Sequence, residues 1–164
     1  MCNRCLDTTE LGSHGSSLWC QKCKTSIVPE DTSLNPNWKC TKCKAILSRE
    51  KVGNLFKSLN QESLNLLNSA ENCTVQKLEA FLRLKKCQLL HPNNMLLIRV
   101  KYSLCGLYGR AKGFEMQDMD KVAMERKLKI CQEVLGVLNK IDPGISTRRG
   151  EVTHCWNHNS SYNV

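Results

Sequence analysis

The chain has 164 residues, enough for one ordinary domain or for a small module joined to a moderate one. Hydrophobic residues make up 41% and charged residues 24%, which excludes a disordered chain and predicts a globular protein. Aromatic residues make up only 5%, so the core must rely on aliphatic side chains, methionine and cysteine, which suits helices better than a β-sandwich. The net charge of +9 would suit a polyanionic partner, but a solvated lysine-rich surface explains it more simply.

The sequence shows no sign of export or membrane insertion. Its first residues, MCNRCLDTTELG, contain no apolar segment of the kind found in a secretory signal. No run of about 18 apolar residues occurs, so no membrane span is predicted. An odd total of 11 cysteines cannot pair completely, and in a reducing compartment cysteine pairs favour metal over disulfides. We therefore expect an intracellular protein of the nucleus, the cytoplasm or both.

Six of the cysteines form Cys-x-x-Cys pairs near the N-terminus. The pairs are Cys2/Cys5, Cys20/Cys23 and Cys40/Cys43. The two-residue gap lets one tight turn aim two thiolates at the same ion, and a second such turn completes a tetrahedral site. Sixteen residues separate the second pair from the third, which is within the range typical of zinc sites. We predict that the second and third pairs together bind one zinc ion.

Residues 15–50 form the predicted zinc module. They hold few apolar residues, so metal binding must supply the free energy that a hydrophobic core would otherwise provide. Residues 18–28 and 38–47 each follow the pattern strand, knuckle, strand, with a tryptophan shortly before the first cysteine. We interpret them as two β-hairpin knuckles that face each other across one zinc, as in a zinc ribbon. Trp19 and Trp38 are expected to cover the hydrophobic side of the site rather than to stack bases.

From residue 51 the apolar periodicity predicts helices. The first covers about 51–67, with a break expected near Asn60, and the second runs from a cap at Thr74 to His91, which precedes a proline. A third helix follows Asn93 or Asn94 and ends near residue 108, and a fourth covers about 118–139. The apolar stripe of the fourth helix comprises Val122, Ile130, Val134, Val137, Leu138 and Ile141.

The predicted fold is therefore mainly α: a small zinc-ribbon-like β-knuckle module followed by an antiparallel helical bundle or TPR-like array over residues 51–152. Ser146 suggests a cap for a fifth helix, but Gly150 and a polar end argue against it. Residues 153–164 are expected to form a frayed tail.

The remaining cysteines and histidines suggest no second site and no catalysis. Cys73, Cys87, Cys105 and Cys131 fall one to a helix or helix edge, which is typical of core packing. His91 is expected to pack or to cap a helix end, and the tail residues Cys155, His154 and His158 show no pattern. No phosphate loop, nucleophile elbow or other catalytic grouping occurs in the sequence.

Several segments in order along residues 2–152 resemble one family. They are Cys2-Asn3-Arg4-Cys5 with Asp7-Thr8-Thr9-Glu10-Leu11-Gly12, the two tryptophan-containing knuckles, Leu90-His91-Pro92-Asn93-Asn94, Lys101-Tyr102-Ser103-Leu104 and Ile141-Asp142-Pro143-Gly144-Ile145-Ser146. Together they resemble the arthropod-type SET and MYND domain proteins of the lysine methyltransferase superfamily. The knuckles resemble the extra zinc-binding insert of arthropod members, and the later segments resemble the C-terminal helical domain.

The resemblance implies that residues 1–14 are a truncated post-SET segment. Cys2 and Cys5 would be a half-site, because the first post-SET cysteine and the cysteine of the SET core have no counterpart. The SET core is missing too, and with it the S-adenosylmethionine pocket, the lysine channel and the catalytic tyrosine. Zinc is then the one cofactor expected here, and S-adenosylmethionine belongs only to a full-length relative.

Three hypotheses follow. The first is a non-catalytic fragment or degenerate paralogue that binds zinc and meets protein partners through its helical domain. The second is an incomplete version of an active S-adenosylmethionine-dependent protein-lysine methyltransferase. The third, not favoured, is a zinc ribbon that binds nucleic acid through the lysines around the knuckles, which also neutralise the thiolates. Those lysines are Lys22, Lys24, Lys39, Lys42 and Lys44.

Overall fold

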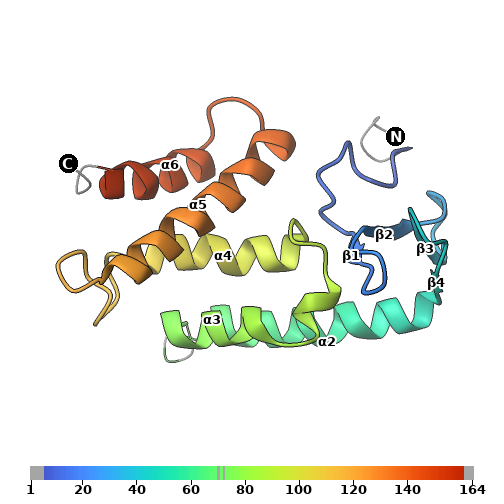
Figure 1. Cartoon of the computed structure of the whole chain (residues 1–164), viewed down its shortest axis with the longest axis horizontal. Coiled ribbons are helices and arrows are strands. Elements are labelled where there is room, and N and C mark those ends of the chain that lie inside the picture. Colours follow the sequence, from blue (N-terminus) through green and yellow to red (C-terminus); the bar gives the residue numbers. More distant parts are fainter. Residues whose placement is uncertain (1–5, 70, 72, 161–164) are drawn as a thin grey trace. The chain divides into compact units, whose positions relative to one another are not determined.

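The computed structural model describes residues 6–69, 71 and 73–160, with side chains described up to residue 157. It divides the chain into two compact units (Figure 1). The knuckle unit comprises residues 1–65 and 81–97, and the helical unit comprises residues 66–80 and 98–164. The chain is mainly helical with one small sheet, as predicted. The division runs through the region 51–152, so the domain boundary near residue 50 stays a prediction.

The knuckle unit contains a four-stranded antiparallel sheet in the order β1-β2-β3-β4. The strands are β1 (Leu18–Trp19), β2 (Ser26–Pro29), β3 (Trp38–Cys40) and β4 (Ile46–Leu47). Leu18 pairs with Ile27 in the first hairpin, and Trp38 pairs with Leu47 in the second. The pairing of Ile27 with Cys40 joins the two hairpins edge to edge. This confirms the predicted pair of strand–knuckle–strand units.

Helix α2 (Arg49–Leu67) continues without interruption past Asn60, so the break expected there is wrong. Asparagine costs a helix only a few tenths of a kcal/mol, and neighbouring polar side chains offset this cost by bonding one turn along. The Ser58 hydroxyl donates to Glu62 at 3.2 Å, and the Gln61 amide donates to Asn65 at 3.0 Å.

Helix α3 (Val75–Arg83) begins as predicted, because Thr74 Oγ1 accepts a hydrogen bond from the Lys77 amide. It ends well before His91, however. The chain tightens into a 3₁₀ turn, η1 (Cys87–Leu89), and Leu90 then forms an isolated antiparallel bridge with Leu18. Pairing with a strand residue requires extended backbone, which explains why the helix could not reach the proline.

Helix α4 (Met95–Leu107) follows Asn94, as predicted. The Asn94 side chain is buried, accepts from the Leu96 amide at 3.0 Å and donates to the Ser17 carbonyl at 3.0 Å. Gly109 follows the helix with a φ of +91°, which a residue with a side chain adopts only under strain.

Helices α5 (Lys121–Ile141) and α6 (Thr147–Ser160) pack against each other in the helical unit, and α6 folds back along α5 (Figure 1). The helix over residues 147–160 corrects the frayed tail that the sequence predicted from residue 153. Its polar sequence shows no clear apolar stripe, so tertiary packing forms it, with Val152 only 1% exposed. The Ser146 hydroxyl caps its start by accepting from the Arg149 amide.

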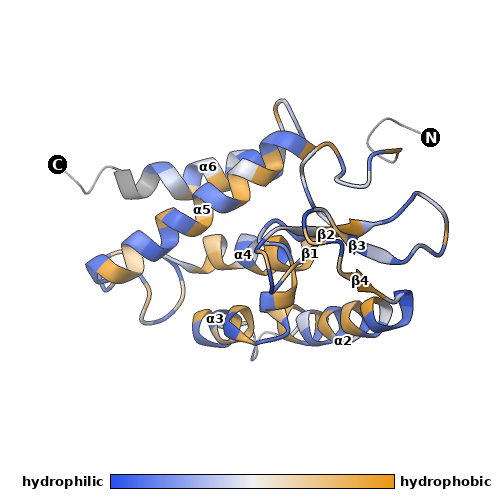
Figure 2. Cartoon of the chain, turned by 45° about the vertical axis from the view of Figure 1, so that its right-hand side comes forward, coloured by the Kyte–Doolittle hydropathy of each residue, from blue (hydrophilic) through white to orange (hydrophobic). Residues whose placement is uncertain are grey.

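Aliphatic side chains fill the core of the helical unit, and hydrophilic and hydrophobic residues alternate along α5 (Figure 2). The buried side chains include Leu104, Cys105, Ile130, Cys131, Val134, Val137, Leu138 and Val152. This confirms most of the predicted stripe, but Val122 is 72% exposed and does not belong to it. Among the helices described, none combines the length and apolar character needed to cross a membrane.

Candidate metal centre

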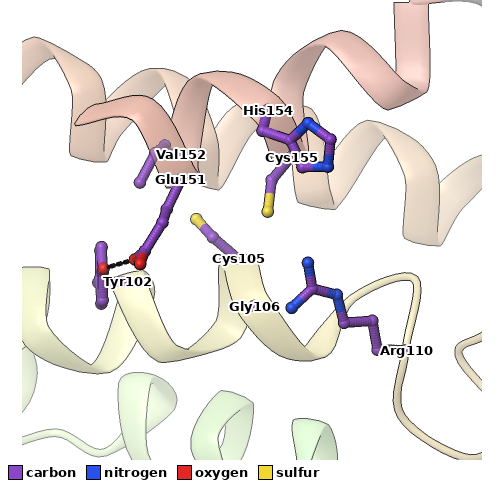
Figure 3. A pocket seen from close by; sticks show the side chains of 8 residues that line it. All are labelled: Tyr102, Cys105, Gly106, Arg110, Glu151, Val152, His154 and Cys155. Atoms are coloured by element: carbon purple, nitrogen blue, oxygen red, sulfur yellow. Dashed lines mark hydrogen bonds between the residues drawn. The ribbon is translucent and has the colours of Figure 1, made fainter. Parts of the chain in front are cut away.

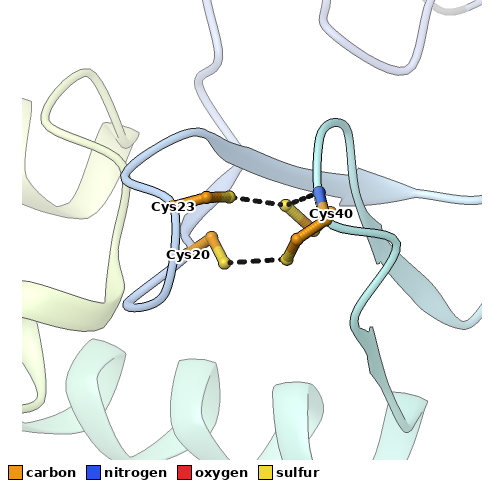
Figure 4. Close-up of side chains that lie close together, drawn as sticks. Cys20, Cys23 and Cys40 are labelled. Carbon is orange, nitrogen blue, oxygen red and sulfur yellow. Dashed lines mark hydrogen bonds between the residues drawn. The ribbon is translucent and has the colours of Figure 1, made fainter.

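Four cysteine sulfurs gather between the two knuckles of the small sheet. Cys20, Cys23, Cys40 and Cys43 each offer an Sγ atom, and all four atoms lie within 4.8 Å of one another. Figure 4 shows the side chains of Cys20, Cys23 and Cys40 pointing toward one space between the two turns. The sequence predicted this grouping from spacing alone. Among the described residues no other group of three or more histidine, cysteine or acidic side chains gathers in this way.

The sulfur spacing fits a tetrahedral ion. The Cys20 and Cys43 sulfurs lie 3.6 Å apart and the Cys23 and Cys40 sulfurs 3.4 Å apart, so each close pair joins one knuckle to the other. A zinc ion with Zn–S bonds of about 2.3 Å needs its sulfurs about 3.8 Å apart. The cluster could therefore hold a zinc ion with only small side-chain movements.

The two knuckles are built alike because the residue after each pair takes the same unusual backbone conformation. Lys24 and Lys44 have φ values of +54° and +58°. Each left-handed residue turns the chain back sharply, so that the Cys20 amide donates to the Thr25 carbonyl and the Cys40 amide to the Ala45 carbonyl, both at 2.8 Å. Local backbone geometry thus gives both pairs the same turn.

Thr25 is a functional residue that the sequence reasoning missed. Its hydroxyl lies 3.1 Å from the Cys23 sulfur and 3.3 Å from the Cys40 sulfur, so it bridges ligands from the two knuckles. The equivalent position in the second knuckle is Ala45, which has no hydroxyl. A threonine two residues after a Cys-x-x-Cys pair was the available signal. Groups that contact metal ligands in this way hold them in the binding geometry.

The polar contacts divide the thiols into acidic and less acidic members. Burial raises the pKa of Cys40, but hydrogen bonds from Thr25 and from the Cys43 and Lys42 amides outweigh it and lower the pKa to about 5. The Thr25 hydroxyl also lowers the pKa of Cys23. The Ala45 amide acts to lower the pKa of Cys43, but the adjacent Cys40 and Cys20 sulfurs outweigh it and raise that pKa to about 11. The thiolate form, which zinc requires, is thus favoured most at Cys23 and Cys40, the two cysteines that the Thr25 hydroxyl contacts.

The two tryptophans take part in packing within the knuckle unit. Trp19 lies edge-on to His91 with ring centroids 5.0 Å apart, and Trp38 lies 5.8 Å from Phe56 of α2. His91 also stacks on His14 at 4.4 Å, which confirms its predicted packing role. These contacts connect the sheet to the α2 and η1 regions of the same unit.

The remaining predicted residues fall outside this cluster. Cys2 and Cys5 lie outside the described residues. Cys87, Cys105 and Cys131 are buried and Cys73 is half-buried. Four knuckle lysines are exposed, and Lys39 lies 3.9 Å from the Glu30 carboxylate. The exposed lysines are Lys22, Lys24, Lys42 and Lys44.

Comparison with known proteins identifies one protein in two isoforms. The chain is 29% identical over 157 residues to isoforms A and B of the SET domain-containing protein SmydA-8 of Drosophila melanogaster. The alignment covers 93% of this chain but only 32% of isoform A and 33% of isoform B, so the chain spans about a third of their length. No family model matches the chain, and no solved structure matches it. The similarity supports the predicted resemblance to arthropod SET and MYND domain proteins.

Proposed function

We propose that this chain is a zinc-binding, protein-interaction region of an arthropod-type SET and MYND protein. The observation that carries the proposal is the convergence of four cysteine sulfurs from two knuckles within 4.8 Å. Similarity to a SET domain-containing protein along 93% of the chain supports the family. The ligands in this proposal are Cys20, Cys23, Cys40 and Cys43.

The zinc acts structurally in this proposal. A catalytic zinc keeps one coordination position open for water or substrate, whereas four thiolates close the coordination sphere. The ion then links two hairpins whose strands are only two to four residues long. Such short strands cannot hold the knuckles together alone, so zinc binding supplies folding free energy.

The helical unit supplies the surface for protein partners in this proposal. Its aliphatic core keeps α5 and α6 packed, while apolar side chains such as Val122 and Ile145 remain exposed at 72% and 109% of their reference areas. The location proposed for the protein is intracellular, where cysteine pairs favour zinc over disulfides.

In this proposal methyl transfer is not assigned to these residues, because the family resemblance places the S-adenosylmethionine pocket and the lysine channel in a SET core. The SET domain named in the relatives favours a second candidate, in which the same region belongs to an active protein-lysine methyltransferase. In that case the catalytic step requires a SET core, and the present region keeps its structural and binding role.

Zinc analysis and a methyl-transfer assay test the proposal together. Purified protein should contain about one zinc per chain by mass spectrometry of the metal, and Cys40→Ser protein should contain much less. Labelled S-adenosylmethionine with histones as acceptors should give no transfer above the level of buffer alone. Transfer by the 164-residue chain would contradict the non-catalytic role proposed for this region, and wild-type protein without zinc would contradict the metal site.

The nucleic-acid hypothesis is separated from the proposal by salt dependence. Binding through exposed lysines should weaken steeply as salt rises, because each phosphate contact releases counterions. A flat response, or unchanged binding after replacement of Lys22, Lys24, Lys42 and Lys44 by alanine, would argue against a nucleic-acid interface.

A further inference from the structure

A cavity in the helical unit is lined by two cysteines that the metal site does not use. It has a volume of about 240 Å³ and lies between residues of α4 and α6. Cys105 of α4 and Cys155 of α6 point their sulfurs into it, beside Arg110 and His154 (Figure 3). A space of this size admits molecules a few atoms large, such as a peroxide.

A third thiol, that of Cys131, lies next to the cavity-lining Cys105. The Cys131 sulfur, from α5, is 3.6 Å from the Cys105 sulfur. Cys105 is 2% exposed and Cys131 is fully buried. A disulfide requires the sulfurs to be about 2.05 Å apart, so an approach of about 1.5 Å through side-chain rotation would join them.

The surroundings favour a thiolate at Cys131. The hydrogen bond between the Cys131 and Cys105 thiols lowers the pKa of Cys131, burial opposes this effect, and the positive charge of Lys127 adds to it. Lys127 lies one helical turn before Cys131 and is only 2% exposed, so water screens its charge weakly. A thiolate is the form that attacks an oxidised sulfur.

Core packing alone, which the sequence predicted for both residues, explains their burial. It does not explain why the Cys105 thiol lines a cavity. It also does not explain why the buried amine of Lys127 lies one helical turn from Cys131, the thiol that Cys105 contacts. A pair that is merely packed would be surrounded by apolar side chains.

We propose that Cys105 and Cys131 form a reversible disulfide when a peroxide enters the cavity. The Cys105 sulfur, once deprotonated, attacks one peroxide oxygen and breaks the O–O bond, which gives a sulfenic acid and a hydroxide that becomes water. The Cys131 thiolate then attacks the sulfenic sulfur, forms the S–S bond and expels hydroxide, which becomes a second water. The two thiols lose two electrons and two protons, and the peroxide is reduced to two waters.

The bond would join α4 to α5 across the core of the helical unit. It would close a loop over residues 105–131, which restricts the unfolded chain and stabilises the folded one. Because the hydrogen bond with Cys131 and then burial keep the pKa of Cys105 above its usual value, the first step is expected to be slow. The pair would therefore respond to sustained rather than brief exposure to peroxide.

Peptide mapping tests the proposal directly. Zinc-loaded protein with all 164 residues is treated with hydrogen peroxide, blocked with N-ethylmaleimide and digested with trypsin without reduction. Cleavage after lysine and arginine puts Cys105 in peptide 102–110, Cys131 in peptide 130–140 and Cys155 in peptide 150–164, each with a single cysteine. We expect a cross-link of 102–110 to 130–140 that disappears on treatment with dithiothreitol.

Cys105→Ser and Cys131→Ser should each abolish the cross-link, and Cys73→Ser should retain it. If either serine variant fails to fold, the wild-type map alone decides the matter. A cross-link of 102–110 to 150–164 instead, or complete maleimide labelling at a dose that oxidises methionines in the same sample, would overturn the proposal.

Discussion

The two units use the same side chain in opposite ways. In the knuckle unit four cysteines occur in pairs on two turns, and their sulfurs converge within 4.8 Å. In the helical unit Cys105 and Cys131 belong to two different helices, and both are buried. Cysteines that share a turn can be assigned to a metal from sequence spacing, whereas cysteines on separate helices become neighbours only through packing.

The units also differ in what stabilises them. The strands of the knuckle sheet are short, and in the proposed function the two turns depend on a shared zinc ion to stay together. The helical unit instead buries a continuous set of leucine, isoleucine and valine side chains. Loss of zinc should therefore damage the first unit, and loss of core volume should damage the second.

The largest expected effect comes from removing a zinc ligand. Cys40→Ser should unfold residues 15–50, because a structural zinc contributes on the order of 10 kcal/mol to such modules. Hydrogen exchange and limited proteolysis should show loss of protection there, while α5 and α6 keep theirs. The half-buried Cys73, changed to serine, is the matched control and should alter nothing in residues 15–50. Full protection of 15–50 in Cys40→Ser and in the presence of chelator would rule out structural zinc.

The next effect concerns the core of α5. Ile130 is fully buried, so Ile130→Ala should destabilise the helical unit by about 2–5 kcal/mol through lost contacts and the cavity left behind. Thermal unfolding followed by circular dichroism measures the change, and zinc content should stay at the wild-type value. Val122→Ala on the same helix removes a side chain that is 72% exposed, and it should change stability by less than about 0.5 kcal/mol. Zinc loss in Ile130→Ala would contradict the contrast between the units.

A smaller effect is expected from the hydroxyl that bridges the two knuckles. Thr25→Val keeps the side-chain shape but removes the hydrogen bonds to the Cys23 and Cys40 sulfurs. Zinc affinity, measured by competition with a chromogenic chelator, should fall roughly tenfold. Thr41→Val is the control, because the Thr41 hydroxyl donates to the Ser26 carbonyl. Equal affinities for both variants would mean that Thr25 plays no part in holding the ligands.

The smallest effect concerns a tyrosine in the helical unit. Burial, with the hydrogen bond to Glu151 and its charge, raises the pKa of Tyr102 to about 12 from an ordinary value of 10. A raised folded-state pKa stabilises the fold below about pH 10, and this contribution is lost as pH rises through about 12. The pair is exposed enough that Tyr102→Phe should cost at most about 1 kcal/mol.

Ultraviolet absorbance titration can follow this tyrosine. The late-ionising step should be missing in Tyr102→Phe, and it should move to lower pH in Glu151→Gln, which keeps an acceptor but removes the charge. Superimposable titration curves for the wild-type protein and Tyr102→Phe would show that Tyr102 ionises normally.

Much of the local structure could be predicted because local signals decide it. The caps at Thr74 and Asn94, the two knuckles and most of the α5 stripe all appear in the structure. The failures at the end of α3 and at α6 occurred where distant residues intervene, whereas the break wrongly expected at Asn60 concerned local side-chain bonds within α2. Leu90 pairs with Leu18, so the helix that was predicted to reach His91 ends earlier. Helix α6 forms by packing on α5, although its sequence lacks an apolar stripe.

The sequence by itself determined which four cysteines could share an ion, because a Cys-x-x-Cys turn sets the direction of both thiols within a few residues. It also determined the similarity to SET and MYND proteins, which extends along most of the chain. Only the tertiary structure decided that the Thr25 hydroxyl bridges two ligands and that the Cys105 and Cys131 sulfurs lie 3.6 Å apart. The reason is physical: these contacts join residues from separate turns and helices, and they exist only after the chain has packed.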